Sequence, residues 1–370
     1  MSKELIQAYV FTAPVVCLLV CLGLLLLDHT TMQLTREEKR LRRFLSLAFG
    51  IVVLLWVGLV FKEVFHRVFA YYFTVFLFSM MVNQVLIYRF VFTITAISEH
   101  DRFGRFHYVL PVLLTVASAV TDLTVAVQHK EAVIYGDSGG TTWFAVLYVL
   151  TGCVALFYYS FYPAIGFLRV RRYRRHIGDY SADVQRTSLN WLVVMQLLTL
   201  IIIPVPFAGL LLNMGDLVNL FFVIPGVLLA FCVYPVLCFN LLSDNYVIMT
   251  SDDNNQPNDD NADKLDPKRF THYLRTHKPY LNPQLRITHV AADLCTNRNY
   301  LSFFINREYG MSFSRLINSY RLKELHRLRI SHDHRARSNA EIVLMSGFSC
   351  YRSYLRAKKM EDKAAILKEN

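Results

Sequence analysis

Long apolar runs alternate with short polar segments through the first two thirds of the chain. Each run has close to twenty residues or more, and a helix of that length can cross about 30 Å of hydrocarbon. We expect seven such spans, at Ala8–Leu27, Phe44–Phe61, Val68–Tyr88, Tyr108–Val127, Trp143–Leu168, Leu189–Leu212 and Val218–Leu242. The first run lacks a preceding basic segment and a clear small-residue cleavage site, which favours a span over a cleavable signal peptide.

The polar segments between these runs differ in charge. Segments 28–43, 89–107 and 169–188 carry 5, 3 and 6 Lys or Arg residues, whereas the N-terminus and the other three segments together carry 4. Lysine and arginine concentrate on the cytoplasmic side of membrane proteins. We therefore expect the N-terminus outside and, after an odd number of spans, the C-terminus in the cytoplasm. The sequence RVRRYRRH in segment 169–188 either binds anionic lipid head groups or serves as a topological anchor.

Few polar residues interrupt the predicted spans. They are Asn83, Gln84, Asp122, Asn190 and Gln196. Polar groups in a membrane can line a ligand cavity, but amide side chains there often form hydrogen bonds between helices. The bundle of residues 1–243 is thus either a sensor for an unknown signal ligand or protein, or only an anchor.

The pattern changes after residue 243. Segment 251–263, SDDNNQPNDDNAD, offers a single alanine as apolar residue, which is too little apolar surface for folding. We expect residues 244–266 to be an acidic flexible linker, which is either a solvated spacer or a mimic of DNA that folds back on the following domain. Net charge divides in the same way, with +5 on residues 1–243, −6 on 244–263 and +12 on 264–370. A surplus of this size favours a polyanionic partner.

Apolar residues return at helical spacing in residues 267–359. One helical face is formed by Ile287, Val290, Ala291 and Leu294. A tight turn at Cys295–Asn297 follows, and Asn297 is well placed to cap a second helix. In that helix the inward-facing residues would be Tyr300, Leu301, Phe304 and Ile305. Two helices joined in this way form a helix-turn-helix, whose second helix enters the major groove of DNA.

The pattern repeats after a long connecting helix. In MSFSRLINSYRLKELHRLRIS the inward residues are Phe313, Leu316, Ile317, Tyr320, Leu322, Leu325 and Leu328. A second short helix is expected at Ser338–Ser346, a turn at Gly347-Phe348, and a final helix from about Cys350, with residues 360–370 as a polar tail. The predicted fold class is therefore all-α, a seven-helix transmembrane bundle followed by a cytoplasmic all-α domain with two helix-turn-helix units.

At this point residues 267–359 closely resemble the AraC/XylS family of transcription regulators. The resemblance rests on the spacing of the first unit, on SFSRLINSYRLKEL as the connecting helix and on EIVLMSGFSCYRSYLRAKK at the end. It implies two recognition helices that enter successive major-groove segments of double-stranded DNA. It also implies a bacterial protein, and the apolar spans then place the chain in the inner (cytoplasmic) membrane, multi-pass, with the C-terminal domain in the cytoplasm.

The family's base-reading positions fall on residues of both recognition helices. They are Asn299, Ser302, Phe303, Tyr351, Arg352, Ser353 and Arg356. Arginine can fork onto guanine, asparagine can pair with adenine, and Phe303 could meet a thymine methyl group; Tyr351 and Phe303 could instead be packing residues. Four further side chains are suited to phosphates, which position a protein on DNA without reading sequence, namely Arg298, Arg307, Lys358 and Lys359.

The chain departs from the family pattern in three places. Cys295 stands where the family often has glycine, which is tolerable if the backbone there avoids a positive φ. Lys358 replaces a usual buried aromatic residue, and the tail MEDKAAILKEN lacks the family's usual closing segment. The second unit is therefore expected to be less stable or less specific, with a loose stretch at His332–Arg337.

Nothing in the sequence supports catalysis. Gly136–Gly140 spells the GDSGG found around the nucleophile of chymotrypsin-like proteases, but it lies in a short outer loop without the domain that would assemble a triad. Other nucleotide-binding, hydrolase and zinc-protease motifs are missing. The histidines, His332 and His334 among them, show no metal-ligand spacing. The chain is predicted not to be an enzyme, and we expect no cofactor and no metal.

The leading hypothesis is a membrane-tethered one-component transcription regulator that binds specific duplex DNA, with the membrane bundle as sensor. The expected partners are double-stranded DNA, the lipid bilayer and an unknown signal ligand or protein. Helix pairs of this family bind DNA as monomers or dimers, so the sequence does not decide whether the chain forms a homodimer. The alternative is a membrane receptor or transporter whose helix-turn-helix tail docks a protein.

Overall fold

A computed structural model describes residues 3–31, 36–97, 102–135, 143–202, 224–243, 245–248, 265–331 and 337–369. The regular secondary structure of these residues is helical, with one isolated antiparallel bridge. The chain divides into two compact units. Unit 1 comprises Met1–Ala96, His100–Arg171 and Asn190–Ile248, and unit 2 comprises Ile97–Glu99, Arg172–Leu189 and Met249–Asn370. Most of the predicted linker, residues 249–264, lies outside the described residues.

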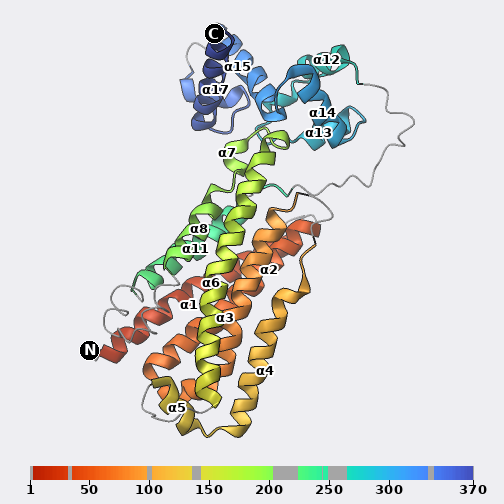
Figure 1. The fold of residues 1–370 in the computed structure, drawn as a ribbon. Coiled ribbons are helices and arrows are strands. Elements are labelled where there is room, and N and C mark those ends of the chain that lie inside the picture. The colour runs from red at the N-terminus through yellow and green to blue at the C-terminus, as the bar shows by residue number, and fades with distance from the viewer. Residues whose placement is uncertain are drawn as a thin grey trace. The chain divides into compact units, whose positions relative to one another are not determined.

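Unit 1 is a bundle of apolar helices (Figure 1). Its long helices are α1 (Lys3–Thr31), α2 (Arg36–Val64), α3 (His66–Ile94), α4 (Val109–Thr124), α6 (Trp143–His176), α8 (Asn190–Ile202) and α11 (Ile224–Leu242). Two short helices flank α4, namely η1 (Arg105–Tyr108) and α5 (Val127–Tyr135). Helix α2 packs against α1 and α3, and α11 packs against α1 and α8.

Four helices of the described part are long and apolar enough to cross a membrane: Glu37–Lys62, His66–Ile94, Arg105–Thr124 and Trp143–Asp179. Three of the predicted spans appear there as shorter apolar helices, Thr12–Leu27, Asn190–Leu200 and Ala230–Leu242. Residues 203–223, which fall within or between the last two predicted spans, lie outside the described residues. The full count of seven spans and the orientation of the chain stay predictions.

Two helices of unit 1 end at other residues than the apolar runs from which they were predicted. The fourth run was expected to continue to Val127, but α4 ends at Thr124 and a separate helix starts at Val127. The fifth was expected to end at Leu168, whereas α6 continues to His176. An arginine-rich stretch carries no apolar signal, yet lysine and arginine have good helix propensity, so hydropathy marks the end of a span and not the end of its helix.

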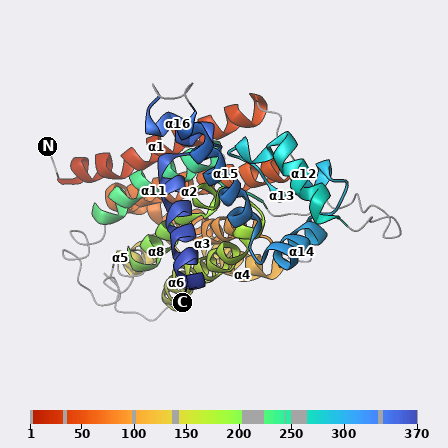
Figure 2. The same ribbon diagram turned by 90° about the horizontal axis from the view of Figure 1, so that it is seen from above.

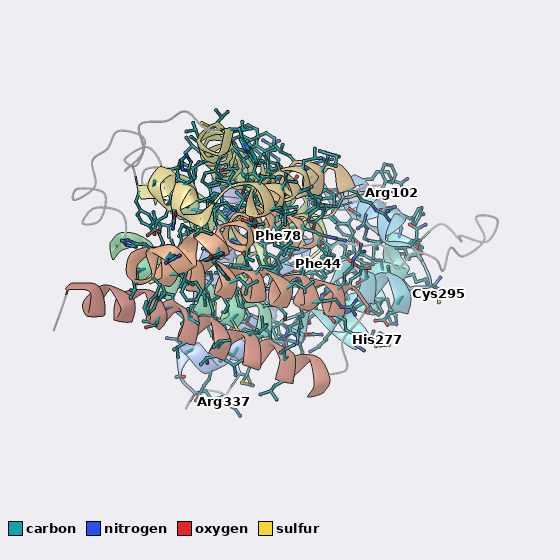
Figure 3. The ribbon with its side chains drawn as sticks, turned by 90° about the horizontal axis from the view of Figure 1, so that it is seen from below. Phe44, Phe78, Arg102, His277, Cys295 and Arg337 are labelled. Atoms are coloured by element: carbon teal, nitrogen blue, oxygen red, sulfur yellow. The ribbon has the colours of Figure 1, made fainter. Side chains whose placement is uncertain are left out.

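Helix α3 is the most buried of the four long apolar helices. It buries Phe69, Phe73, Leu77 and Met81 among its neighbours, while Phe44 and Phe78 also lie among the helices (Figure 3). Helix α4 has the opposite character, because most of its apolar side chains are exposed, including Val112, Leu113, Val116, Val120 and Leu123. A continuous exposed apolar face of this kind is unfavourable in water and matches a lipid environment.

A charged pair joins α4 to α5. The Lys130 ammonium donates a hydrogen bond to Asp122 at 2.5 Å, and the Thr74 hydroxyl donates to the second oxygen of the same carboxylate at 2.8 Å. The Lys130 side chain is only 2% exposed. Asp122 thus compensates a buried cation and fixes the turn between two helices, which gives this intrahelical polar residue a structural role.

Unit 2 is built around one long helix, α15 (Phe313–Ile330). The C-terminal part of the chain adds α12 (Pro267–His277), η5 (Pro279–Leu281), α13 (Ile287–Asp293), α14 (Arg298–Tyr309), α16 (Asn339–Met345) and α17 (Tyr351–Glu369). An earlier segment adds the end of α6, η2 (Ile177–Asp179) and α7 (Val184–Thr187). Helix α15 packs against α14, α16, α17, η5 and η2, and Figure 2 shows α15 among the C-terminal helices.

Local sequence accounts for the helix boundaries of unit 2. The predicted cap at Asn297 is confirmed, since its side chain accepts a hydrogen bond from the Tyr300 amide at 2.7 Å. Ser338 and Glu341 form a reciprocal capping box at the start of α16. Gly310 ends α14 in the left-handed conformation, with φ +62°. The last helix continues to Glu369, through the segment predicted as a polar tail.

The predicted apolar faces of the first helix pair are buried. Ile287, Val290, Ala291 and Leu294 are all below one tenth exposed, as are Leu301, Phe304 and Ile305. Most of the inward residues of α15 are buried too, whereas Tyr320 and Leu322 are half-buried. Tyr300, which was also predicted to point inward, is half-buried. The helical spacing of apolar residues therefore identified most of the core of the C-terminal helices.

The turn between α13 and α14 differs from the expectation. Cys295 has a φ of +53°. Cysteine was expected to be tolerable there only if the backbone avoids a positive φ, and this condition is not met. The residue is exposed and lies at the surface of the molecule (Figure 3). A side chain in the left-handed region crowds the following carbonyl and costs about 1–2 kcal/mol.

Replacement of Asp122 should lower the stability of unit 1, because it leaves a buried lysine without its counter-charge. We expect Asp122→Ala to destabilise unit 1 by about 2–3 kcal/mol, because it leaves the Lys130 ammonium buried without its carboxylate. The double variant Asp122→Leu/Lys130→Met removes both charges and should recover most of that loss. Thermal unfolding in detergent measures both; equal losses in the two variants would contradict the pairing.

Glycine at position 295 should stabilise unit 2. We expect Cys295→Gly to raise the free energy of local unfolding by about 1 kcal/mol, because glycine adopts a positive φ without a Cβ clash. Cys295→Ala is the control, since it keeps a Cβ and should change little. Hydrogen exchange of peptides from α13 and α14 in the purified full chain gives the measurement, and an equal gain from alanine would mean that the thiol, not the backbone, is responsible.

Candidate nucleic-acid interface

Helix α14 presents a polar and aromatic face to solvent. Asn299 is exposed, Ser302 is half-buried and Phe303 is 62% exposed. Phe303 is mostly exposed, so its side chain is available to a partner, and its role as a base contact or a packing residue stays a prediction. These three residues were the predicted base contacts of the first unit, and the structure places them along one side of a single helix.

The opposite face of α14 holds the helix in place. Leu301, Phe304 and Ile305 are buried, and the ring of Phe304 meets that of Phe270 from α12 edge to face, with centroids 5.5 Å apart. Helix α13 packs against the same helix. Burial of one face thus fixes which residues of α14 remain available to a partner.

Helix α17 repeats this division. Tyr354 and Ala357 are buried and belong to one core cluster with Phe348 of the preceding turn. Arg352, Arg356 and Lys359 are exposed, and their spacing of four and three residues puts them on one side of the helix. The face of the second predicted recognition helix is therefore basic.

Two other predicted base contacts on α17 differ in availability. Tyr351 is 45% exposed, with its ring 5.5 Å from that of Tyr354, so it is partly a packing residue. Ser353 is half-buried, and its hydroxyl donates to the Cys350 carbonyl at 2.8 Å. The Cys350 amide donates back to the same hydroxyl at 3.4 Å, so Ser353 has local hydrogen-bond partners at the start of the helix, and its contact to a base stays a prediction.

The predicted phosphate contacts lie on the same two helices. Lys358 and Lys359 are exposed on α17. Arg307 forms an ion pair with Glu308 at 2.7 Å and lies 5.9 Å from the centre of the Phe303 ring. Ion pairs at the surface are weak. Arg307 can therefore leave the Glu308 carboxylate and bind another anion, such as a phosphate group.

Arg298 and Asn299 interact directly at the start of α14. The Arg298 guanidinium donates to the Asn299 side-chain oxygen at 2.9 Å, and its carbon lies 5.3 Å from the centre of the Tyr180 ring. A predicted phosphate contact therefore orients a predicted base contact. Tyr180 comes from a distant part of the chain and was not among the predicted site residues.

The structure adds two buried charged residues on α15 that the sequence analysis missed. Arg321 is 1% exposed. Its guanidinium donates to the Tyr280 carbonyl at 2.8 Å and to the Asn282 carbonyl at 2.7 Å, and it lies 5.8 Å from the centre of the Phe348 ring. Burial lowers the pKa of Arg321 to about 10, against the opposing effect of the Asp183 charge. One cation thus joins η5, α15 and the turn of the second helix pair.

Glu324 is the second of these residues and is 7% exposed. Its carboxylate accepts two hydrogen bonds from Arg327, at 2.6 and 3.1 Å, and one from Lys278 at 3.5 Å. The Arg327 bonds lower the pKa of Glu324 despite its burial, and Lys278 lowers it further. The buried carboxylate is thereby kept ionised and ties the end of α12 to the middle of α15.

The turn of the second pair is tightly enclosed. Gly347 has a φ of +94°, and a Cβ at this position would lie 2.3 Å from the Tyr280 carbonyl oxygen. Glycine is needed here both for its conformation and for the close approach of η5. Arg321 donates to that same carbonyl, so the two contacts fix the turn of the second pair against η5.

Other predicted chemistry lies partly outside the described residues. The GDSGG segment and residues 332–336, with both loop histidines, fall there. Among the residues that the structure describes, no cluster of three or more potential metal ligands is found.

Protonation of Glu324 should destabilise unit 2. Because its pKa in the folded protein lies below the usual 4.5, the stabilisation is present above pH 4.5 and is lost as pH falls through the folded-state value. We expect Glu324→Gln to lower stability at neutral pH by about 1 kcal/mol and to flatten the acid limb of the stability profile. Hydrogen exchange of α15 against pH measures this; an unchanged acid limb would argue against the ion pairs.

The three comparisons with known proteins add no relative. No protein-family model, no curated protein and no solved structure matches this chain.

Proposed function

We propose that the chain is a membrane-tethered, one-component transcription regulator of the AraC/XylS type. In this proposal α13–α14 and α16–α17 are two helix-turn-helix units, and α14 and α17 are recognition helices. The observation that carries it is the shared organisation of these two helices. Each follows a short helix and a turn, buries one side against the core around α15, and exposes the side on which the predicted base contacts lie.

The exposed chemistry of the two helices suits DNA. Arg352 and Arg356 could fork onto guanine, and Asn299 could pair with adenine. Phe303 offers an exposed ring for a thymine methyl group, which explains an aromatic residue left outside the core. The net charge of +12 on residues 264–370 adds the attraction to phosphates that any such complex requires.

The membrane part supports a tether. Four helices are long and apolar enough to cross a bilayer, and we propose seven spans in all, with the N-terminus outside and the C-terminus in the cytoplasm of a bacterium. Unit 2 would then stay beneath the inner membrane, joined to it by the acidic linker and by α6. The DNA that it reads must come to the membrane, while the bundle senses a signal ligand or protein.

The intact protein should select specific duplex DNA. We expect the full chain, purified in lipid nanodiscs, to enrich particular sequences from a random duplex library. The affinity for the enriched sequence should fall steeply with salt, because phosphate contacts release counterions. A library without enrichment at any salt concentration would overturn the proposal.

Arginine substitutions on α17 test the assignment of the reading face. Arg352→Ala and Arg356→Ala should each cost about 1–3 kcal/mol of binding and relax the preference at one base pair. Lys359→Ala should weaken binding to all sequences alike. Arg102→Ala in unit 1 is the charge-matched control and should bind as the unmodified protein does. Retained regulation in cells by a double arginine variant that no longer binds DNA would favour a protein-docking tail.

A further inference from the structure

Part of unit 2 comes from the middle of the chain. Arg172–Leu189 groups with the C-terminal residues and not with the apolar bundle. The division falls inside α6, between Arg171 and Arg172, and the helix itself runs without interruption from Trp143 to His176. The sequence analysis treated this segment as a basic loop that anchors the topology or binds lipid.

The backbone of this segment pairs with the residues that lead into α13. Ser181 and Arg286 form an antiparallel bridge. The Ala182 amide donates to the Leu285 carbonyl and the Ile287 amide donates to the Tyr180 carbonyl, both at 3.0 Å. Two such bonds around one residue pair are the pattern of a short two-stranded ladder. The first helix of the candidate reading unit therefore starts from a segment that the mid-chain residues hold.

The side chains of the same segment are buried. Ile177, Ala182 and Leu189 are at most 1% exposed, and Tyr180 is 6% exposed. Helix η2 packs against α15, close to its N-terminus, where Gly178 approaches Ser312. A loop that served only as a basic anchor would leave such residues in water, so this burial indicates a permanent part of the unit's core.

Two contacts connect the segment to the functional residues of unit 2. The Tyr180 ring lies under the Arg298 guanidinium, which donates to Asn299. Asp183 is buried near enough to Arg321 for their charges to interact. Stacking on an aromatic ring restricts a guanidinium while leaving its N–H groups available. Tyr180 can thus hold Arg298, and through it Asn299, in one orientation at the start of α14.

We propose that Tyr180 is a positioning residue for the DNA-reading surface, and that segment Ile177–Leu189 couples α6 to the first helix-turn-helix unit. This inference rests on the proposed function. Only η2 separates the end of α6 at His176 from the paired residues at Tyr180. Because this connection is short, it can absorb little of a rotation or shift of the end of α6. Such a motion would move the Tyr180 ring and the start of α13 together. The signal would act on recognition through this contact, whereas the acidic linker would serve only as a second, passive connection.

A disulfide tests the docking without any need for DNA. In an antiparallel pair bonded in this way, the two Cα atoms lie about 4.5 Å apart, which is inside the range of about 4.4–6.8 Å that disulfides need. Ser181→Cys/Arg286→Cys should form an intramolecular bond in membranes under mild oxidation, identified by peptide mass spectrometry. Arg174→Cys/Arg286→Cys is the control, with its first thiol on α6, and should not cross-link.

Hydrogen exchange of the unmodified full chain gives the same test without a substitution. The docked segment predicts slow exchange for the amides of Ala182 and Ile287, since both donate within the pairing. Rapid exchange of both amides, or a double-cysteine variant that stays reduced in protein with normal exchange elsewhere in unit 2, would overturn the docking.

Substitution of Tyr180 tests positioning. The probe is the duplex that the unmodified full chain selects from a random library. We expect Tyr180→Leu to weaken binding about two- to fivefold and to lower the preference for adenine at the base pair that Asn299→Ala also affects. Tyr180→Phe keeps the ring and should restore both properties.

The outcomes separate the two proposals. If the unmodified chain selects no DNA while the disulfide forms, the proposed function fails and the docking stands. If DNA is selected but Tyr180→Leu binds it with unchanged affinity and base preference, the positioning role is overturned. If Tyr180→Phe behaves like Tyr180→Leu, the ring stacking is not the cause and the proposal fails as well.

Discussion

A single buried cation, Arg321, determines how the parts of unit 2 meet. A guanidinium removed from water must find hydrogen-bond acceptors, since an uncompensated buried charge costs several kcal/mol. Here the acceptors are backbone carbonyls of η5 and the segment after it, the nearby ring is that of Phe348, and a carboxylate is supplied by Asp183. These groups come from three separate stretches of sequence. The cation is compensated only when all of them are in place, so it joins η5, the mid-chain segment and the turn of the second helix pair to α15.

The features that sequence predicted best were local ones. Asn297 was expected as a helix cap and is one, because a cap depends on residues three positions apart. The apolar spacing of α13, α14 and α15 identified most of the core. The candidate site is equally local: the exposed face of α14 follows from which of its residues are apolar. The spans were predicted from hydropathy, and in the described residues four helices are long and apolar enough to cross a membrane.

Long-range contacts account for what sequence could not predict. Arg321 and Glu324 alternate with apolar residues along α15. Charged residues are usually solvated, and the burial of these two depends on partners elsewhere in the chain. The pairing of Ser181 with Arg286 joins residues with no common pattern. Cys295 shows a different limit, since cysteine gives no local signal for a positive φ. The turn between α13 and α14 adopts that conformation even though the residue carries a Cβ.

The discontinuous make-up of unit 2 has a consequence for how such a protein could arise. A domain formed by one uninterrupted stretch can be transferred between genes as a single cassette. Unit 2 draws Arg172–Leu189 from between apolar helices, so its C-terminal part would lose buried core residues if it were fused to an unrelated membrane region. The two halves are therefore constrained to evolve together, and a recombinant that exchanges the apolar bundle must carry this short internal segment with the domain that it completes.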